Sequence, residues 1–283
     1  RVAAGSGAPL SAAEATNRIC ARCHQVLFSG YPHTWEGRAR RGDAQGPGGS
    51  HINSGEARDF LLGACSRAMA CTACHDPHGE DSAEALARLR TPAGNAVCTR
   101  CHAELAAGPA LAAHARHRPD GEGGACLNCH LPKKNLGLSY QLTGYHRIGS
   151  PTDRARVESD RPLECALCHT GATTAELLGQ MERLWGKRYD REALAALYGD
   201  LDRPVLQATL ERGKAHEQAA ALGALAARGD ARAVPAMLPA MENRYPLIRL
   251  FARACVQRLA PGCEVDVEQP VEAIRAQAQR CIR

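Results

Sequence analysis

The stretch Cys71-Thr-Ala-Cys-His75 is one of five Cys-x-x-Cys-His motifs in this chain of 283 residues. Each motif places two cysteines three positions apart and a histidine directly after the second cysteine. A random chain of the same cysteine and histidine content would hold roughly 0.03 such motifs, so their repetition reflects a function. The motif cysteines are Cys20, Cys23, Cys71, Cys74, Cys98, Cys101, Cys126, Cys129, Cys165 and Cys168, and the motif histidines are His24, His75, His102, His130 and His169.

The motif chemistry favours covalently attached haem. Two thiols on one turn of chain can form thioethers with the two vinyl groups of a haem, and the adjacent histidine then reaches the iron from the same side. Zinc also binds paired cysteines, but a zinc site closes with four ligands and does not explain a histidine after every second cysteine. A redox-active disulfide is a weaker interpretation. The sequence therefore predicts five haems c, with the motif histidines as proximal ligands.

The sixth ligand of each iron decides its chemistry, and seven further histidines could supply it. We expect His33, His51, His78, His117 and His146 to be the distal ligands. His114 is the alternate to His117, because the two are spaced to share a helical face, and His216 is expected to be an exposed or capped helix histidine. His78 lies too close to His75 to cross its own haem, so it should serve a neighbouring iron or else lie at the surface. Bis-His irons are low-spin and closed to substrate, which suits electron transfer rather than catalysis.

Composition and charge agree with haem and argue against nucleic acid as a partner. The formal net charge is +5, and each oxidised bis-His haem with two propionates adds about −1, so the basic excess balances the haems. Aromatic residues make up only 4% of the chain, so we expect the haems to fill the core of the first half. No transmembrane segment is expected. Haem is attached in this way outside the cytoplasm, so we expect a periplasmic, extracellular or outer-surface location, with an export signal removed or outside this sequence.

The pattern of apolar residues predicts a mainly α fold with little or no β structure. Residues 1–170 should form a loop-rich pentahaem domain with a short helix over 82–90, and a glycine-rich loop over 37–55 should deliver His51. Residues 171–205 should form bridging helices, beginning at a capping box of Thr173 and Glu176. Residues 206–283 should form a HEAT-like helical segment with a period of roughly thirty residues, shorter than usual for that repeat, and Gly229 should end one of its helices.

Four cysteines lie outside the motifs, namely Cys65, Cys255, Cys263 and Cys281. Disulfides are the favoured interpretation in an oxidising compartment, and a bond between Cys263 and Cys281 would tie down the C-terminal segment. Four cysteines allow three pairings, and the sequence does not choose among them.

The repeated motif, the sequence Cys-His-Asp-Pro-His around His75 and the segment 126–134 resemble bacterial multihaem cytochromes with doubled haem-binding motifs. Some members of that group carry C-terminal HEAT-like or other helical repeats. The resemblance covers residues 20–169 strongly and the remainder loosely. It implies closely stacked haems, alternately parallel and perpendicular, and a role in respiratory or extracellular electron transfer. Pentahaem nitrite reductases have the same number of haems, but they replace one motif histidine by lysine, and this chain has no such motif.

Three functions follow as hypotheses. The first is electron transfer, without catalytic residues, between redox protein partners or other cytochrome subunits. The second is a multihaem reductase of a small nitrogen or sulfur oxyanion, with one open iron. The third is a haem-wire subunit of an oligomer, complex or filament.

Overall fold

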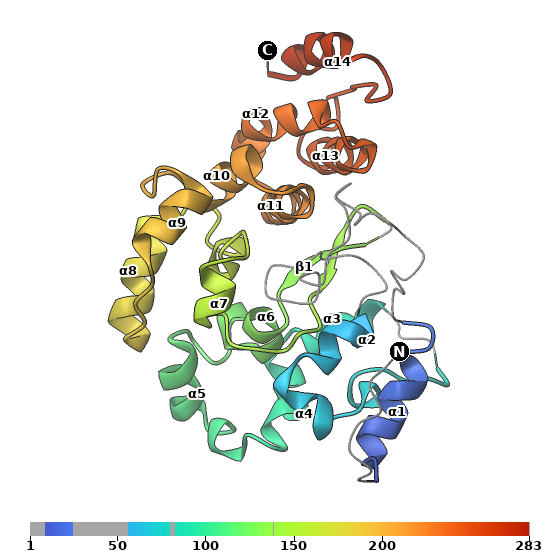
Figure 1. The fold of residues 1–283 in the computed structure, drawn as a ribbon, viewed down its shortest axis with the longest axis vertical. Helices are drawn as coiled ribbons and strands as arrows, with labels where there is room; N and C mark the ends of the chain where they lie inside the picture. Colours follow the sequence, from blue (N-terminus) through green and yellow to red (C-terminus); the bar gives the residue numbers. More distant parts are fainter. Residues whose placement is uncertain (1–8, 25–55, 80–82, 138, 283) are drawn as a thin grey trace. The chain divides into compact units, whose positions relative to one another are not determined.

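The computed structural model of the chain describes residues 9–24, 56–79, 83–137 and 139–282 (Figure 1). His33, His51 and the predicted loop over 37–55 lie outside the described residues. The chain forms two compact units. Unit 1 consists of the described residues within Arg1–Leu27, Ser54–Leu131 and Tyr145–Gly149, and unit 2 of those within Pro132–Gly144 and Ser150–Arg283. Four of the motifs lie in unit 1, whereas the fifth, Cys165–His169, lies in unit 2; the predicted domain boundaries stay a prediction.

Helices dominate the described residues, which contain a single two-stranded sheet, so the predicted mainly α fold is confirmed. No helix within the described ranges is long and apolar enough to cross a membrane.

Unit 1 is built from short helices joined by tight turns. Its α-helices are α1 (Ala12–Cys20), α2 (Glu56–Leu61), α3 (Ala83–Leu89), α4 (Ala96–Thr99), α5 (Gly108–Ala115) and α6 (Cys126–His130). Its 3-10 helices span Ala64–Arg67, Cys71–Ala73, Pro92–Asn95, Ala103–Leu105 and Glu122–Gly124. Helix α1 begins at a capping box in which Ser11 and Glu14 bind each other's backbone N–H groups. Helix α3 confirms the helix predicted over 82–90.

Helix α5 ends earlier than the sequence suggested. Its last residue is Ala115, and Arg116 adopts a left-handed conformation with φ of 57°. The expectation that His114 and His117 share a helical face is therefore wrong, because His117 lies beyond the end of the helix.

Few apolar side chains fill the interior of unit 1. Its buried apolar residues are Ala57, Phe60, Leu111, Ala125, Leu127 and Tyr145, whereas the large apolar cluster among the described residues belongs to unit 2. A unit with so small an apolar interior needs another source of buried contacts. This agrees with the expectation that haems fill it.

Unit 2 combines a hairpin with packed helices. Strands β1 (Lys133–Leu136) and β2 (Leu142–Gly144) pair antiparallel, with Leu136 opposite Leu142. The helices are α7 (Arg154–Val157), α8 (Thr174–Trp185), α9 (Arg191–Tyr198), α10 (Val205–Arg212), α11 (Ala215–Arg228), α12 (Val234–Met237), α13 (Pro246–Leu259) and α14 (Val271–Ala278). The 3-10 helices span Glu164–Leu167, Ala231–Ala233, Leu238–Glu242 and Gln279–Ile282.

Helix α11 is the centre of unit 2. It packs against α10, α13 and β1, and ten of its fourteen residues are buried (Figure 1). At Gly223, an added Cβ would lie 2.5 Å from the side chain of Leu142, so glycine permits the close approach of the hairpin. The capping box at Thr173 and the helix end at Gly229 are as predicted. The HEAT-like classification stays a prediction.

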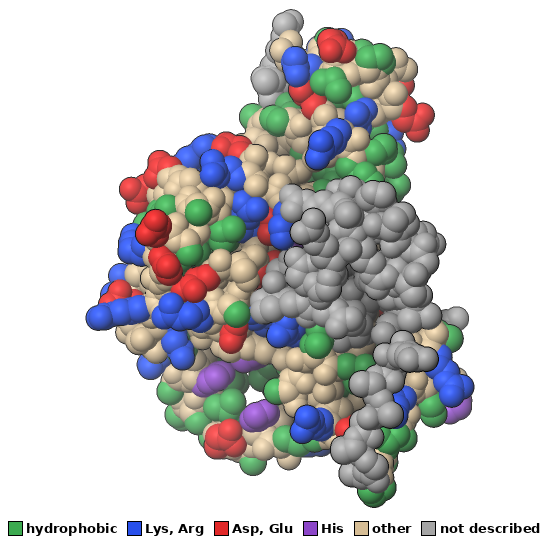
Figure 2. Space-filling view, in the orientation of Figure 1, with side chains coloured by type: hydrophobic (Ala, Val, Ile, Leu, Met, Phe, Trp, Pro, Cys, Tyr) green, Lys and Arg blue, Asp and Glu red, His purple; other side chains and the backbone are tan. Residues whose placement is uncertain are grey.

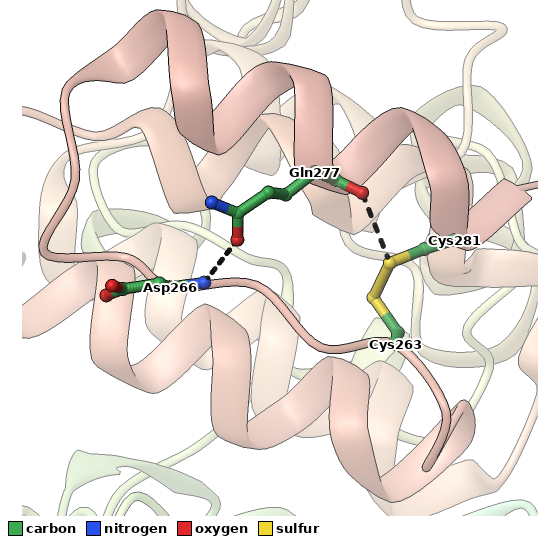
Figure 3. Close-up of a disulfide and its surroundings, with 4 residues drawn as sticks. All are labelled: Cys263, Asp266, Gln277 and Cys281. Carbon is green, nitrogen blue, oxygen red and sulfur yellow. Dashed lines mark hydrogen bonds between the residues drawn. A yellow bond between two sulfur atoms is a disulfide. The ribbon is translucent and has the colours of Figure 1, made fainter.

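A disulfide between Cys263 and Cys281 holds the C-terminal segment (Figure 3). The backbone N–H of Asp266, three residues after Cys263, donates to Gln277 Oε1 at 2.7 Å and gives this segment a second link. The suggested bond is thus confirmed. Cys65 and Cys255 are not disulfide-bonded.

Candidate haem-binding sites

The five motifs share one local conformation, a single turn of helix. In four of them, the histidine N–H donates to the carbonyl of the first cysteine, as in His75 N to Cys71 O at 3.1 Å, and the fourth motif is helix α6 itself. None of the ten motif cysteines is disulfide-bonded, and all are at least partly exposed. This turn places two thiols and an imidazole on the same short segment, as covalent attachment of one haem requires.

Two motif histidines each lie opposite a second histidine. The ring centroids of His75 and His146 are 6.3 Å apart, and those of His114 and His130 are 5.9 Å apart. The planes of the two rings differ by 26° and 14°, respectively. Two imidazoles bound on opposite sides of one metal, through bonds of about 2 Å each, have centroids roughly 6 Å apart. Both pairs therefore fit the spacing of axial ligands to a single iron.

The ring of His130 is held by the backbone of the segment that carries His146. His130 Nδ1 lies 2.9 Å from the Gly149 carbonyl oxygen, and Gly149 N–H donates to the His130 carbonyl at 3.2 Å. When Nδ1 carries the proton, it donates to this carbonyl and leaves the lone pair of Nε2 for a metal. One short strap, Tyr145–Gly149, thus contacts both the second and the fourth motif.

Other predicted distal ligands lie in different surroundings. His117 is exposed, with Nδ1 2.7 Å from the Ala115 carbonyl oxygen, and its ring packs against Gly123. His78 is exposed, and its N–H donates to Asp76 Oδ1 at 3.0 Å. His216 is buried within α11, so the expectation that it is exposed is wrong; the packing of α11 against its neighbours covers it. In Figure 2, histidine side chains border an opening in the surface near α5.

The first cysteines of the motifs in unit 1 lie side by side in two pairs. Burial, together with the neighbouring Cys20 thiol, raises the pKa of the Cys71 thiol to about 11. The Cys98 thiol donates a hydrogen bond to Cys126, which raises the pKa of Cys98 and lowers that of Cys126 to about 7. With the motifs numbered in chain order from the one at Cys20, motif 1 therefore adjoins motif 2, and motif 3 adjoins motif 4. Two asparagines, Asn17 and Asn95, join the motifs within each pair, and neither was predicted from the sequence.

Buried ion pairs surround the segment that leads into the fifth motif. Lys134 Nζ lies 2.7 Å from Asp160 Oδ2, and Arg161 Nη2 lies 2.8 Å from Glu217 Oε2. Arg156 binds Glu164, directly before Cys165, at 3.1 Å. No sequence signal pointed to these pairs, since they join residues up to 56 positions apart.

One group in this network has the residue types of a metal site. Ligand atoms of Asp160, His216 and Glu217 lie within 4.8 Å of one another. Each of the two carboxylates already contacts a buried cation, Lys134 or Arg161. A divalent ion would add an uncompensated charge to this balanced group, so the arrangement is explained as an ion-pair network.

Comparison with known families agrees with the motif chemistry. Residues 65–107, which contain the second and third motifs, match the family described as the doubled CXXCH motif. This match supports a multihaem c-type cytochrome. It supports covalent haem c binding, and electron transfer as the general activity. No match was found among curated proteins or solved structures.

Proposed function

We propose that this protein carries five covalently attached haems c, most of them with two axial histidines, and that it transfers electrons. The single observation that carries the proposal is the spacing of the pairs His75–His146 and His114–His130. Haem bound in this way supplies reversible one-electron exchange at its iron.

The residues of the chain have three tasks in this proposal. The motif cysteines fix each haem by two thioethers, and the motif histidine binds one side of the iron. The second histidine closes the other side, which excludes a substrate and keeps the iron low-spin. His114 is proposed as the partner of His130 in place of His117, because the His114 ring lies opposite the His130 ring. His33, His51 and His78 remain proposed ligands for other irons.

The location and partners follow from the cofactor. We place the protein in respiratory or extracellular electron transport, in the periplasm or at the outer cell surface, because haem c is attached outside the cytoplasm. Its partners are then redox proteins or other cytochrome subunits. With five haems the net charge of the oxidised protein is close to zero, because the chain contributes +5 and each haem contributes about −1.

The test combines haem content with spectroscopy of the purified holoprotein. We expect the intact mass to contain five haems, the oxidised spin-resonance spectrum to be wholly low-spin, and the reduced spectrum to be unchanged by carbon monoxide. A high-spin signal from one haem, with binding of carbon monoxide, would favour the reductase hypothesis. Cysteines that carry zinc or no haem would overturn the proposal altogether.

A further inference from the structure

Asn17, on α1, joins the first two motifs through hydrogen bonds of its side chain. It stands three residues before Cys20 and is only 1% exposed. Its Oδ1 accepts from the backbone N–H of Cys71 at 2.9 Å, and its Nδ2 donates to the carbonyl of Met69 at 3.0 Å. A second donation reaches Ser66 O, also at 3.0 Å. A residue of α1, the helix that leads into motif 1, thus binds the backbone at the start of motif 2.

Asn95 joins the third and fourth motifs in the same manner. It stands three residues before Cys98 and is 8% exposed. Its Oδ1 accepts from the backbone N–H of Cys126 at 2.8 Å, and its Nδ2 donates to the carbonyl of Gly124 at 2.8 Å. In both cases the N–H belongs to the first cysteine of the next motif, and the carbonyl lies two residues before that cysteine.

The two asparagines act as helix caps from a different segment. The first N–H groups of a helical turn lack partners within it, and a preceding Ser, Thr, Asp or Asn often supplies one. Here the capping positions are Ala70 and Ala125, which offer no side-chain acceptor. Asn17 and Asn95 supply the missing acceptor, so the turn of one motif is completed by a residue that stands three positions before the adjacent motif.

The sequence repeats this arrangement at alternate motifs. Asparagine occupies the third position before the first cysteine in motifs 1 and 3. The same position holds Ala68, Gly123 and Pro162 in motifs 2, 4 and 5. Asn17 and Asn95 therefore define two equivalent modules in unit 1, one of motifs 1 and 2 and the other of motifs 3 and 4.

We propose that Asn17 and Asn95 are equivalent positioning residues, each fixing the relative placement of the two haems within one module. The proposal rests on the proposed function, since it requires haem on these motifs. Thioethers make each haem move with its cysteines, and buried hydrogen bonds of 2.8 to 2.9 Å leave little freedom between the two backbones. The spacing and angle of a haem pair are thereby set by one side chain.

The experiment uses the holoprotein with five haems and the variants Asn17→Ala, Asn95→Ala and the double variant. The matched control is Asn243→Ala in unit 2, because Asn243 Oδ1 also accepts from a backbone N–H, that of Tyr245, and its Nδ2 donates to Gln218 Oε1, but all three residues lie outside the motifs. The readout is the paired positive and negative circular dichroism of the Soret band, which depends on the mutual orientation of neighbouring haems. Intact mass reports the haem content.

We expect each single variant to lose part of the amplitude and the double variant to lose more, because each asparagine joins a different pair of motifs. The control should keep the wild-type amplitude. A wild-type Soret signal in Asn95→Ala with all haems present would overturn the inference while leaving the proposed function intact. If Asn95→Ala acquires fewer haems, Asn95→Leu, which has a similar volume and loses both the bond from Cys126 N–H and the donation to Gly124 O, is measured instead, and an unchanged signal there overturns the inference equally. Absence of haem from the wild type would instead refute the proposed function.

Discussion

Replacing His114 by alanine should open one haem iron of the five. In the structure, the His114 ring lies 5.9 Å from that of the motif histidine His130. The side chain is exposed at the end of α5, so its loss should change the free energy of unfolding of the polypeptide by no more than about 0.5 kcal/mol. The spectroscopic effect should be large by comparison, because one iron of five loses its sixth ligand. We expect a fifth of the low-spin signal to become high-spin.

The assay is titration of the reduced holoprotein with carbon monoxide, together with quantitative spin resonance of the oxidised form. His114→Ala should bind one carbon monoxide per chain, and wild type none. The matched control is His117→Ala, three residues away and equally exposed, which should bind none. His146→Ala should behave like His114→Ala, because His146 lies opposite His75. Binding of carbon monoxide by His117→Ala, with none by His114→Ala, would refute the assignment of the ligand from ring spacing.

Three further predictions concern unit 2. Lys134→Met should lower the free energy of unfolding by about 3 to 5 kcal/mol in urea titrations, since it leaves the Asp160 carboxylate buried without its cation. The double variant that also carries Asp160→Leu should recover most of this loss. A loss from Lys134→Met below about 1 kcal/mol would contradict the prediction. Replacing Cys263 and Cys281 by serine should lower the free energy of unfolding by about 3 kcal/mol, because their disulfide links residues 18 positions apart. The same variant should be cleaved faster by protease after residue 263, and an unchanged cleavage rate would argue against this role of the disulfide. Burial raises the pKa of Tyr198 well above its ordinary value, so above about pH 10 unfolding releases its proton. The free energy of unfolding should therefore fall as pH rises above about 10, by up to about 1.4 kcal/mol per pH unit, and less steeply in Tyr198→Phe. An equal pH dependence in the two proteins would exclude Tyr198 as the cause of this fall.

The shared helical turn of the five motifs could be expected from the sequence because its geometry is local. Two cysteines three positions apart and the next histidine lie on one helical turn, so spacing alone identifies them. The caps at Thr173 and Gly229 were predictable for the same reason, since each depends on neighbours within a few positions. The hairpin Lys133–Gly144 was not predicted, because Lys-Lys-Asn lacks the alternation of a strand and its burial comes from contact with α11.

The sequence by itself determined the five Cys-x-x-Cys-His motifs and the mainly helical fold, because both depend on residues close together in the chain. Only the tertiary structure brought His146 opposite His75, 71 positions earlier, and placed Asn95 against the start of the fourth motif. It also distinguished His114 from His117, since the left-handed residue Arg116 ends the helix between them. Such choices depend on where distant backbone segments meet, and the packing of the whole unit, rather than residue spacing, decides that.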